Sequence, residues 1–73
     1  MNAAGIAEVT VKINALDQEI NTNKEMLKQP GISENERVAI RNEIAAYIQR
    51  LTGLEAERRE LRQQQQASAG KFL

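Results

Sequence analysis

A proline followed by a glycine divides this chain into two helix-forming segments. Pro30 has no backbone N–H to donate to a helix, and Gly31 readily adopts the positive φ that ends one. A helix that arrives from the N-terminal side is therefore predicted to end near residue 28, with a turn over residues 29–32. Both flanking segments carry apolar residues at helical spacing, so the turn determines how the two predicted helices pack against each other.

A capping motif follows the predicted turn. Ser33 and Glu36 have the Ser-x-x-Glu spacing of a capping box, in which the serine hydroxyl accepts a hydrogen bond from the glutamate N–H. Glu34 and Glu36 also put negative charge in the first turn, where the helix dipole favours it. We predict that a second helix begins at about residue 33.

Residues 3–28 carry the heptad pattern of one half of a coiled coil. Residues recur every seven positions in two sets, and the second set follows the first by three positions. The two sets are Ile6, Ile13, Ile20 and Leu27, and Val9, Leu16 and Asn23. Asn23 is the polar exception, interpreted either as a buried residue that fixes the pairing of the helices or as a loosening of the stripe. Its closeness to the turn favours the second interpretation.

Residues 33–64 repeat this pattern and widen it. The two interleaved sets are Ile40, Tyr47, Leu54 and Leu61, and Arg37, Ile44, Leu51 and Arg58. At ~100° per residue, Ile48, Val38 and Ala45 fall on the same side, which gives an apolar arc of roughly 160°, broader than one partner helix covers. The predicted interaction seam comprises Ile6, Val9, Ile13, Leu16, Ile20, Leu27, Ile40, Ile44, Tyr47, Ile48, Leu51, Leu54 and Leu61.

These patterns predict an all-α fold, an antiparallel helical hairpin that forms a two-helix coiled coil and assembles into a helical bundle. The predicted hairpin domain spans residues 1–66, with helices over residues 3–28 and 33–64. A flexible C-terminal tail is predicted over residues 67–73, because a short glutamine tract and small residues lead into it.

The turn also predicts how the helices pair. If it is tight and centred between Pro30 and Gly31, Ile13 lies opposite Ile48. The second helix is the longer of the two at ~1.5 Å per residue, so its last turns are expected to project beyond the first helix.

Size and composition favour assembly. A chain of 73 residues lies in the range where one hydrophobic core is often too small to be stable alone. The chain has one Phe, one Tyr and no Trp, so its apolar surface is mainly aliphatic. We predict a homo-oligomer, with a dimer of hairpins favoured, or binding to the helices of a partner protein.

Composition also excludes several classes of function. The absence of Cys and His removes disulfides, thiol chemistry, Cys/His zinc sites and imidazole catalysis, and favours an intracellular, cytoplasmic protein. Ten basic and ten acidic residues cancel, which argues against nucleic acid or anionic lipid held mainly by charge. No apolar run approaches the ~20 residues of a membrane span, so a soluble protein is predicted.

No pattern of residues indicates a catalytic, cofactor-binding or metal-binding site. We therefore predict a non-enzymatic protein–protein interaction or oligomerisation module that acts through coiled-coil packing and uses no cofactor. The alternative is a small dimeric helical regulator that binds nucleic acid through an Arg-bearing face, because every cation of the second helix is Arg. A third hypothesis is that the chain is the N-terminal assembly domain of a longer protein.

Overall fold

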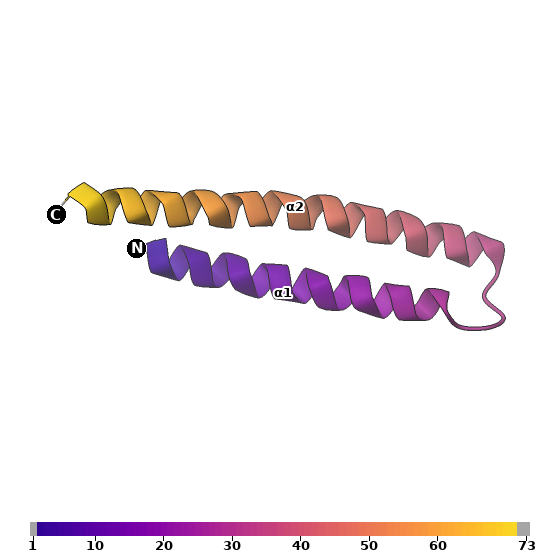
Figure 1. Cartoon of the computed structure of the whole chain (residues 1–73). Coiled ribbons are helices and arrows are strands. Elements are labelled where there is room, and N and C mark those ends of the chain that lie inside the picture. Colours follow the sequence, from indigo (N-terminus) through magenta and orange to yellow (C-terminus); the bar gives the residue numbers. More distant parts are fainter. Residues whose placement is uncertain (1, 72–73) are drawn as a thin grey trace.

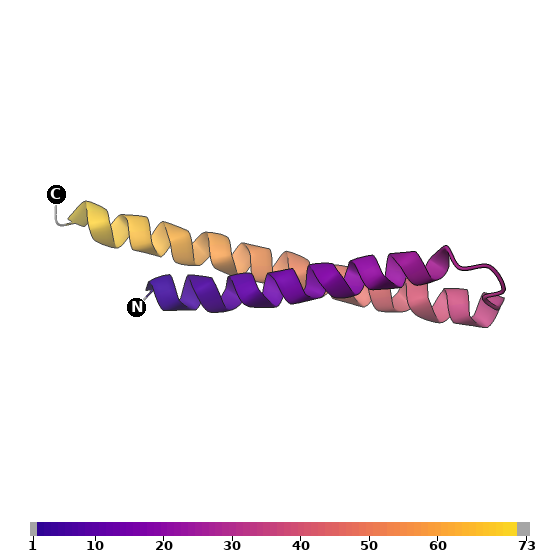
Figure 2. The same cartoon turned by 90° about the horizontal axis from the view of Figure 1, so that it is seen from below.

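The chain forms two helices that lie side by side and run in opposite directions. The computed structural model describes the backbone of residues 2–71 and the side chains of residues 5–66. Helix α1 spans Asn2–Leu27 and helix α2 spans Glu34–Lys71. Figures 1 and 2 show a narrow rod, with the start of α1 and the end of α2 at the same end. The predicted all-α helical hairpin is confirmed.

The break between the helices lies where the sequence predicts it. Gly31 has a φ of 85°, a conformation that residues with a Cβ rarely adopt. Before it, the backbone N–H of Lys28 donates to the carbonyl oxygen of Glu25 at 3.1 Å, which tightens the last turn of α1. Helix α1 therefore ends at Leu27, one residue before its predicted end.

The predicted capping motif forms at the start of α2. The Ser33 hydroxyl accepts a hydrogen bond from the Glu36 N–H at 3.2 Å and lies 3.0 Å from Glu36 Oε1. The glutamate side chain thus binds the serine hydroxyl rather than the backbone N–H of a full capping box. The Arg37 N–H donates to the Ser33 carbonyl at 3.0 Å, which makes Ser33 the N-cap residue of α2.

The connection is not the tight turn that the sequence predicts. Helix α2 begins beyond the end of α1, because residues 28–33 run outward along the rod before the chain reverses (Figure 1). The Arg37 side chain spans this offset, and its guanidinium donates to the Leu27 carbonyl oxygen at 3.2 Å. One of the last carbonyl groups of α1, which has no partner within its own helix, is thereby satisfied.

This offset changes which residues face each other. A Cβ built on Gly5 would lie 3.6 Å from Leu61 Cδ1, and the Arg58 guanidinium donates to Thr10 Oγ1 at 3.2 Å. For a given residue of α1, the residue of α2 that faces it therefore lies about six positions closer to the C-terminus than a tight turn would place it. This is a shift of ~9 Å along the helix.

The predicted pairing of Ile13 with Ile48 is consequently wrong. The alignment given by these two contacts places Leu54 opposite Ile13. Seven residues further along α1, the facing residue lies seven residues earlier on α2.

The C-terminal part of α2 also differs from the prediction. The helix continues to Lys71 instead of ending near residue 64, so the predicted flexible tail over residues 67–73 is helical as far as it is described, and residues 72–73 lie outside the described residues. Gln and Ala favour helix, and neither Pro nor an N-capping motif interrupts the stretch. The end of α2 extends past the start of α1, as expected from their lengths (Figure 1).

The core of the hairpin is one layer thick. Five apolar side chains with described positions are buried, and four of them belong to α1: Val9, Ile13, Leu16, Ile20 and Ile40. Even these are 4–8% exposed, since each helix is covered by the other on one side only. The buried apolar side chains therefore lie only along the line where α1 and α2 meet.

Replacing Ser33 with Ala is expected to lower the free energy of unfolding by about 1 kcal/mol, because the Glu36 N–H at the start of α2 loses its side-chain acceptor. Urea unfolding followed by circular dichroism, at one protein concentration, measures this change. Ser33→Asp keeps an acceptor at the N-cap and should lose far less. Equal losses in the two variants would contradict a capping role for the hydroxyl.

Candidate functional site

The seam between the helices is a single row of side chains from each helix. Its residues are buried or half-buried and recur at alternating intervals of three and four. The structure places in it every predicted seam residue except Ile48: Ile6, Val9, Ile13, Leu16, Ile20, Leu27, Ile40, Ile44, Tyr47, Leu51, Leu54 and Leu61. Asn23, Arg37 and Arg58 complete the row.

Ile48 lies beside the seam. It follows the seam residue Tyr47 by one position, and 46% of its surface is exposed. Val38 follows the seam residue Arg37 in the same way and is 47% exposed. The wide apolar arc predicted for the second helix is therefore present, and α1 covers only one edge of it, because Val38 and Ile48 lie on the same side of the seam.

Asn23 is buried in the seam. It is 6% exposed, and its side-chain Nδ2 has no hydrogen-bond partner within the described part of the chain. The alignment given by the Gly5–Leu61 and Arg58–Thr10 contacts, continued along the heptads, places Ile44 opposite it, and Ile44 has no side-chain acceptor. Of the two interpretations of Asn23, the structure agrees with the buried polar residue and not with a loosened end of the stripe. A buried amide without a partner costs about 1–3 kcal/mol.

Two of the arginines of α2 are engaged within the hairpin. Arg37 binds the carbonyl end of α1, and Arg58 binds Thr10, each at 3.2 Å. Both side chains are half-buried, as is usual for arginines whose apolar stems are covered while the charged group reaches a polar partner. The arginines of α2 that remain for the alternative, a nucleic-acid-binding face, are Arg41, Arg50, Arg59 and Arg62.

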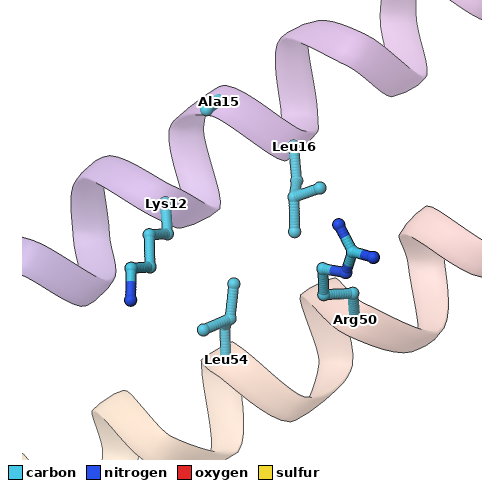
Figure 3. Close-up of a pocket in the computed structure, with 5 residues that line it drawn as sticks. All are labelled: Lys12, Ala15, Leu16, Arg50 and Leu54. Carbon is cyan, nitrogen blue, oxygen red and sulfur yellow. The ribbon is translucent and has the colours of Figure 1, made fainter.

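A shallow groove opens on one side of the seam. It has a volume of about 410 Å³ and is lined by Lys12, Ala15, Leu16, Arg50 and Leu54. Figure 3 shows Lys12 and Leu16 directed from α1 toward α2, and Leu54 directed back toward α1. The groove combines an apolar floor with two cations. No carboxylate, hydroxyl or thiol lines it, so it has no acid–base pair for catalysis.

Tyr47 is the one titratable residue whose pKa is clearly shifted among those described. Its hydroxyl donates to Glu43 Oε1 at 2.8 Å, and this hydrogen bond raises the pKa of Tyr47. Burial and the negative charges of Glu43 and Glu19 raise it further, while Arg50 opposes them. Sequence reasoning missed this pair, although its spacing of four residues on a helix was the available signal.

Other kinds of site are not found in the described residues. No three His, Cys, Asp or Glu side chains among them gather as a metal site requires. Within residues 2–71, neither helix has an apolar stretch long enough to cross a bilayer. Comparisons of the chain with protein-family models, curated proteins and solved structures find no match. The candidate site is therefore the seam, its groove and the exposed apolar side of α2.

Asn23→Leu is expected to raise the free energy of unfolding by about 1–2 kcal/mol, because it replaces a buried amide without a partner by an apolar side chain facing Ile44. Thermal and urea unfolding at a fixed protein concentration measure the change. Asn21→Leu, on the exposed side of the same helix, serves as the matched control and should stay within about 0.5 kcal/mol. A loss of stability in Asn23→Leu would show that the amide has a partner after all.

The phenol of Tyr47 should titrate above its ordinary pKa of 10.0. Because the shift favours the neutral phenol in the folded state, its contribution to stability is present below pH 10 and lost as the pH rises through the raised value. Tyr47 is the only tyrosine and the chain has no Trp, so phenolate absorbance reports it directly. Glu43→Ala should lower the midpoint, and Glu34→Ala should not. An unchanged midpoint in Glu43→Ala would rule out the hydrogen bond as the cause.

Proposed function

We propose that this protein is a non-enzymatic interaction or oligomerisation module whose hairpin packs against further helices, from a second copy or a partner protein. The observation that carries the proposal is surface area. The chain exposes 5585 Å², whereas a compact monomer of 8.2 kDa exposes about 4,500 Å². An excess of about 1,000 Å² is comparable to the area that one partner contributes to a specific interface, about 800 Å².

The shape of the hairpin supports the same proposal. Its radius of gyration is 17.3 Å, against about 11 Å for a compact domain of this length. The molecule measures 61 × 15 × 13 Å, so most side chains lie on its surface. A rod one helix pair thick becomes a compact bundle when other helices pack along its length.

Apolar side chains on the outside of the hairpin add to this argument. Val11, Met26, Val38 and Ile48 are 67%, 44%, 47% and 46% exposed. Single exposed apolar residues need no explanation, but Val38 and Ile48 lie on the same side of α2, each directly after a seam residue. Burial of this side by a further helix removes apolar surface from water and favours association.

The nucleic-acid alternative receives less support. Arg37 and Arg58 are engaged within the hairpin. Of the four other arginines of α2, Arg50 lies at the groove, before a seam residue, while Arg41, Arg59 and Arg62 each follow one. One exposed arginine therefore lies on one side of the seam and three on the other, where Glu55, which follows Leu54, lies between Arg41 and Arg59. Binding of labelled RNA or DNA that weakens steeply with salt would revive this alternative.

Sedimentation equilibrium combined with circular dichroism across protein concentration tests the proposal. Mass and helicity are expected to rise together, and Ile44→Asp should abolish both, because it places a charge in the one-layer seam. Gln18→Asp adds the same charge at an exposed polar residue of α1 and should leave both unchanged. A wild-type chain that stays a fully helical monomer over the whole range, or an Ile44→Asp variant that remains a folded monomer, would overturn the proposal.

A further inference from the structure

A second row of residues runs along α2 beside the seam. Each of its members follows a seam residue by one position, so the row keeps the same alternating spacing of three and four, turned about 100° around the helix. We call the part of this row over residues 38–55 the Ile48 face; it comprises Val38, Arg41, Ala45, Ile48, Thr52 and Glu55, all of them exposed. Arg59 and Arg62 continue the row beyond this face. It lies on the opposite side of the seam from the groove, whose α2 residue Arg50 precedes a seam residue.

The middle of the Ile48 face is apolar. Ile48 is 46% exposed, and Ala45 lies one turn before it. One turn after it, the Thr52 hydroxyl donates to the carbonyl oxygen of Ile48 at 3.0 Å. Because this hydroxyl is satisfied within its own helix, it does not need water, and Thr52 adds its methyl group to the apolar surface.

The charges of the Ile48 face are arranged symmetrically about this centre and have opposite signs. Arg41 lies seven residues before Ile48 and Glu55 lies seven residues after it, each ~10.5 Å away along the helix. Neither residue belongs to an ion pair of the described residues.

When the Ile48 faces of two copies meet, both charges can lie opposite a charge of the other sign in only one relative orientation of the two helices. If two copies of α2 pack in opposite directions about a twofold axis near Ile48, Arg41 of each copy meets Glu55 of the other. A parallel arrangement would instead set arginine against arginine and glutamate against glutamate.

We infer that a second copy of this chain docks on the Ile48 face, with α2 antiparallel to α2 and the two Ile48 side chains at the centre. This inference rests on the proposed interaction function and names its partner and contact surface. The charge arrangement supplies the choice of partner, because the face is complementary to itself. Two hairpins joined in this way bring four helices together, and the excess of about 1,000 Å² per chain suffices for a standard interface.

The test is charge reversal measured by sedimentation equilibrium at low salt, where exposed charges interact most strongly. Arg41→Glu and Glu55→Arg are each expected to weaken self-association at least about 10-fold, because the twofold axis repeats every reversed contact. Neither change removes an ion pair among residues 5–66, whose side chains the structure describes. The helicity of each variant, measured at high concentration, shows that the hairpin still forms.

Mixing the two single variants gives the decisive measurement. In a mixed dimer, the introduced glutamate of one chain meets the introduced arginine of the other, while the unchanged Arg41 meets the unchanged Glu55. The mixture should therefore associate within about threefold of the wild-type affinity. The double variant, with both charges exchanged, should also recover. Recovery on mixing requires contact between chains, which no effect within one hairpin reproduces.

Glu60→Arg is the matched control, since it makes the same change as Glu55→Arg at an exposed residue that precedes the seam residue Leu61. It should leave self-association unchanged. A dimer that ignores the single reversals, fails to recover on mixing, or is weakened equally by Glu60→Arg overturns this inference alone and leaves the proposed function standing. A wild-type chain that is a folded monomer at all concentrations overturns both.

Discussion

The packing of one apolar row on each helix against the other is the constraint on which the whole structure depends. Within an isolated hairpin, each helix has a single neighbour, so each can bury only one narrow stripe. This explains why the buried apolar residues are few and why four of them lie on α1, the helix whose stripe is the more purely apolar. One neighbour covers only one side of a helix, so α2 retains an uncovered side that carries apolar residues.

The alignment of the two rows is set by contacts at the turn and not by the rows themselves. A heptad pattern repeats, so two such rows can pair in several alignments that differ by seven residues. The link over residues 28–33, with Gly31 at positive φ, starts α2 beyond the end of α1. Arg37 then reaches back to the Leu27 carbonyl at the end of α1. A different alignment would set another residue of α2 opposite Asn23, whose Nδ2 is buried without a partner in the described part of the chain.

The sequence predicts those features that depend on local chemistry. Pro30 and Gly31 mark the end of α1, Ser33 and Glu36 mark the start of α2, and the strict heptads identify nearly the whole seam. The alignment of the helices escapes prediction, because it depends on the path of the link and on one long-range contact of Arg37, neither of which residue spacing contains. Ile48 is wrongly predicted in the seam because a rotation of 100° per residue widens the arc, whereas two helices in a coiled coil follow a period of 3.5.

The burial of Asn23 escapes prediction for a related reason. Its closeness to the turn in sequence suggests a frayed end, yet Arg37 and the outward link extend the hairpin past that end, so Asn23 lies inside the paired region. The hairpin thus departs in two ways from the pattern that a self-contained one would show: a polar side chain, Asn23, lies inside, and large apolar side chains, Ile48 among them, lie outside. A sequence that specifies one structure keeps such departures where function requires them. An apolar residue exposed at the centre of a face with self-complementary charges fits the proposal that this hairpin is one half of a larger bundle whose second half is another copy.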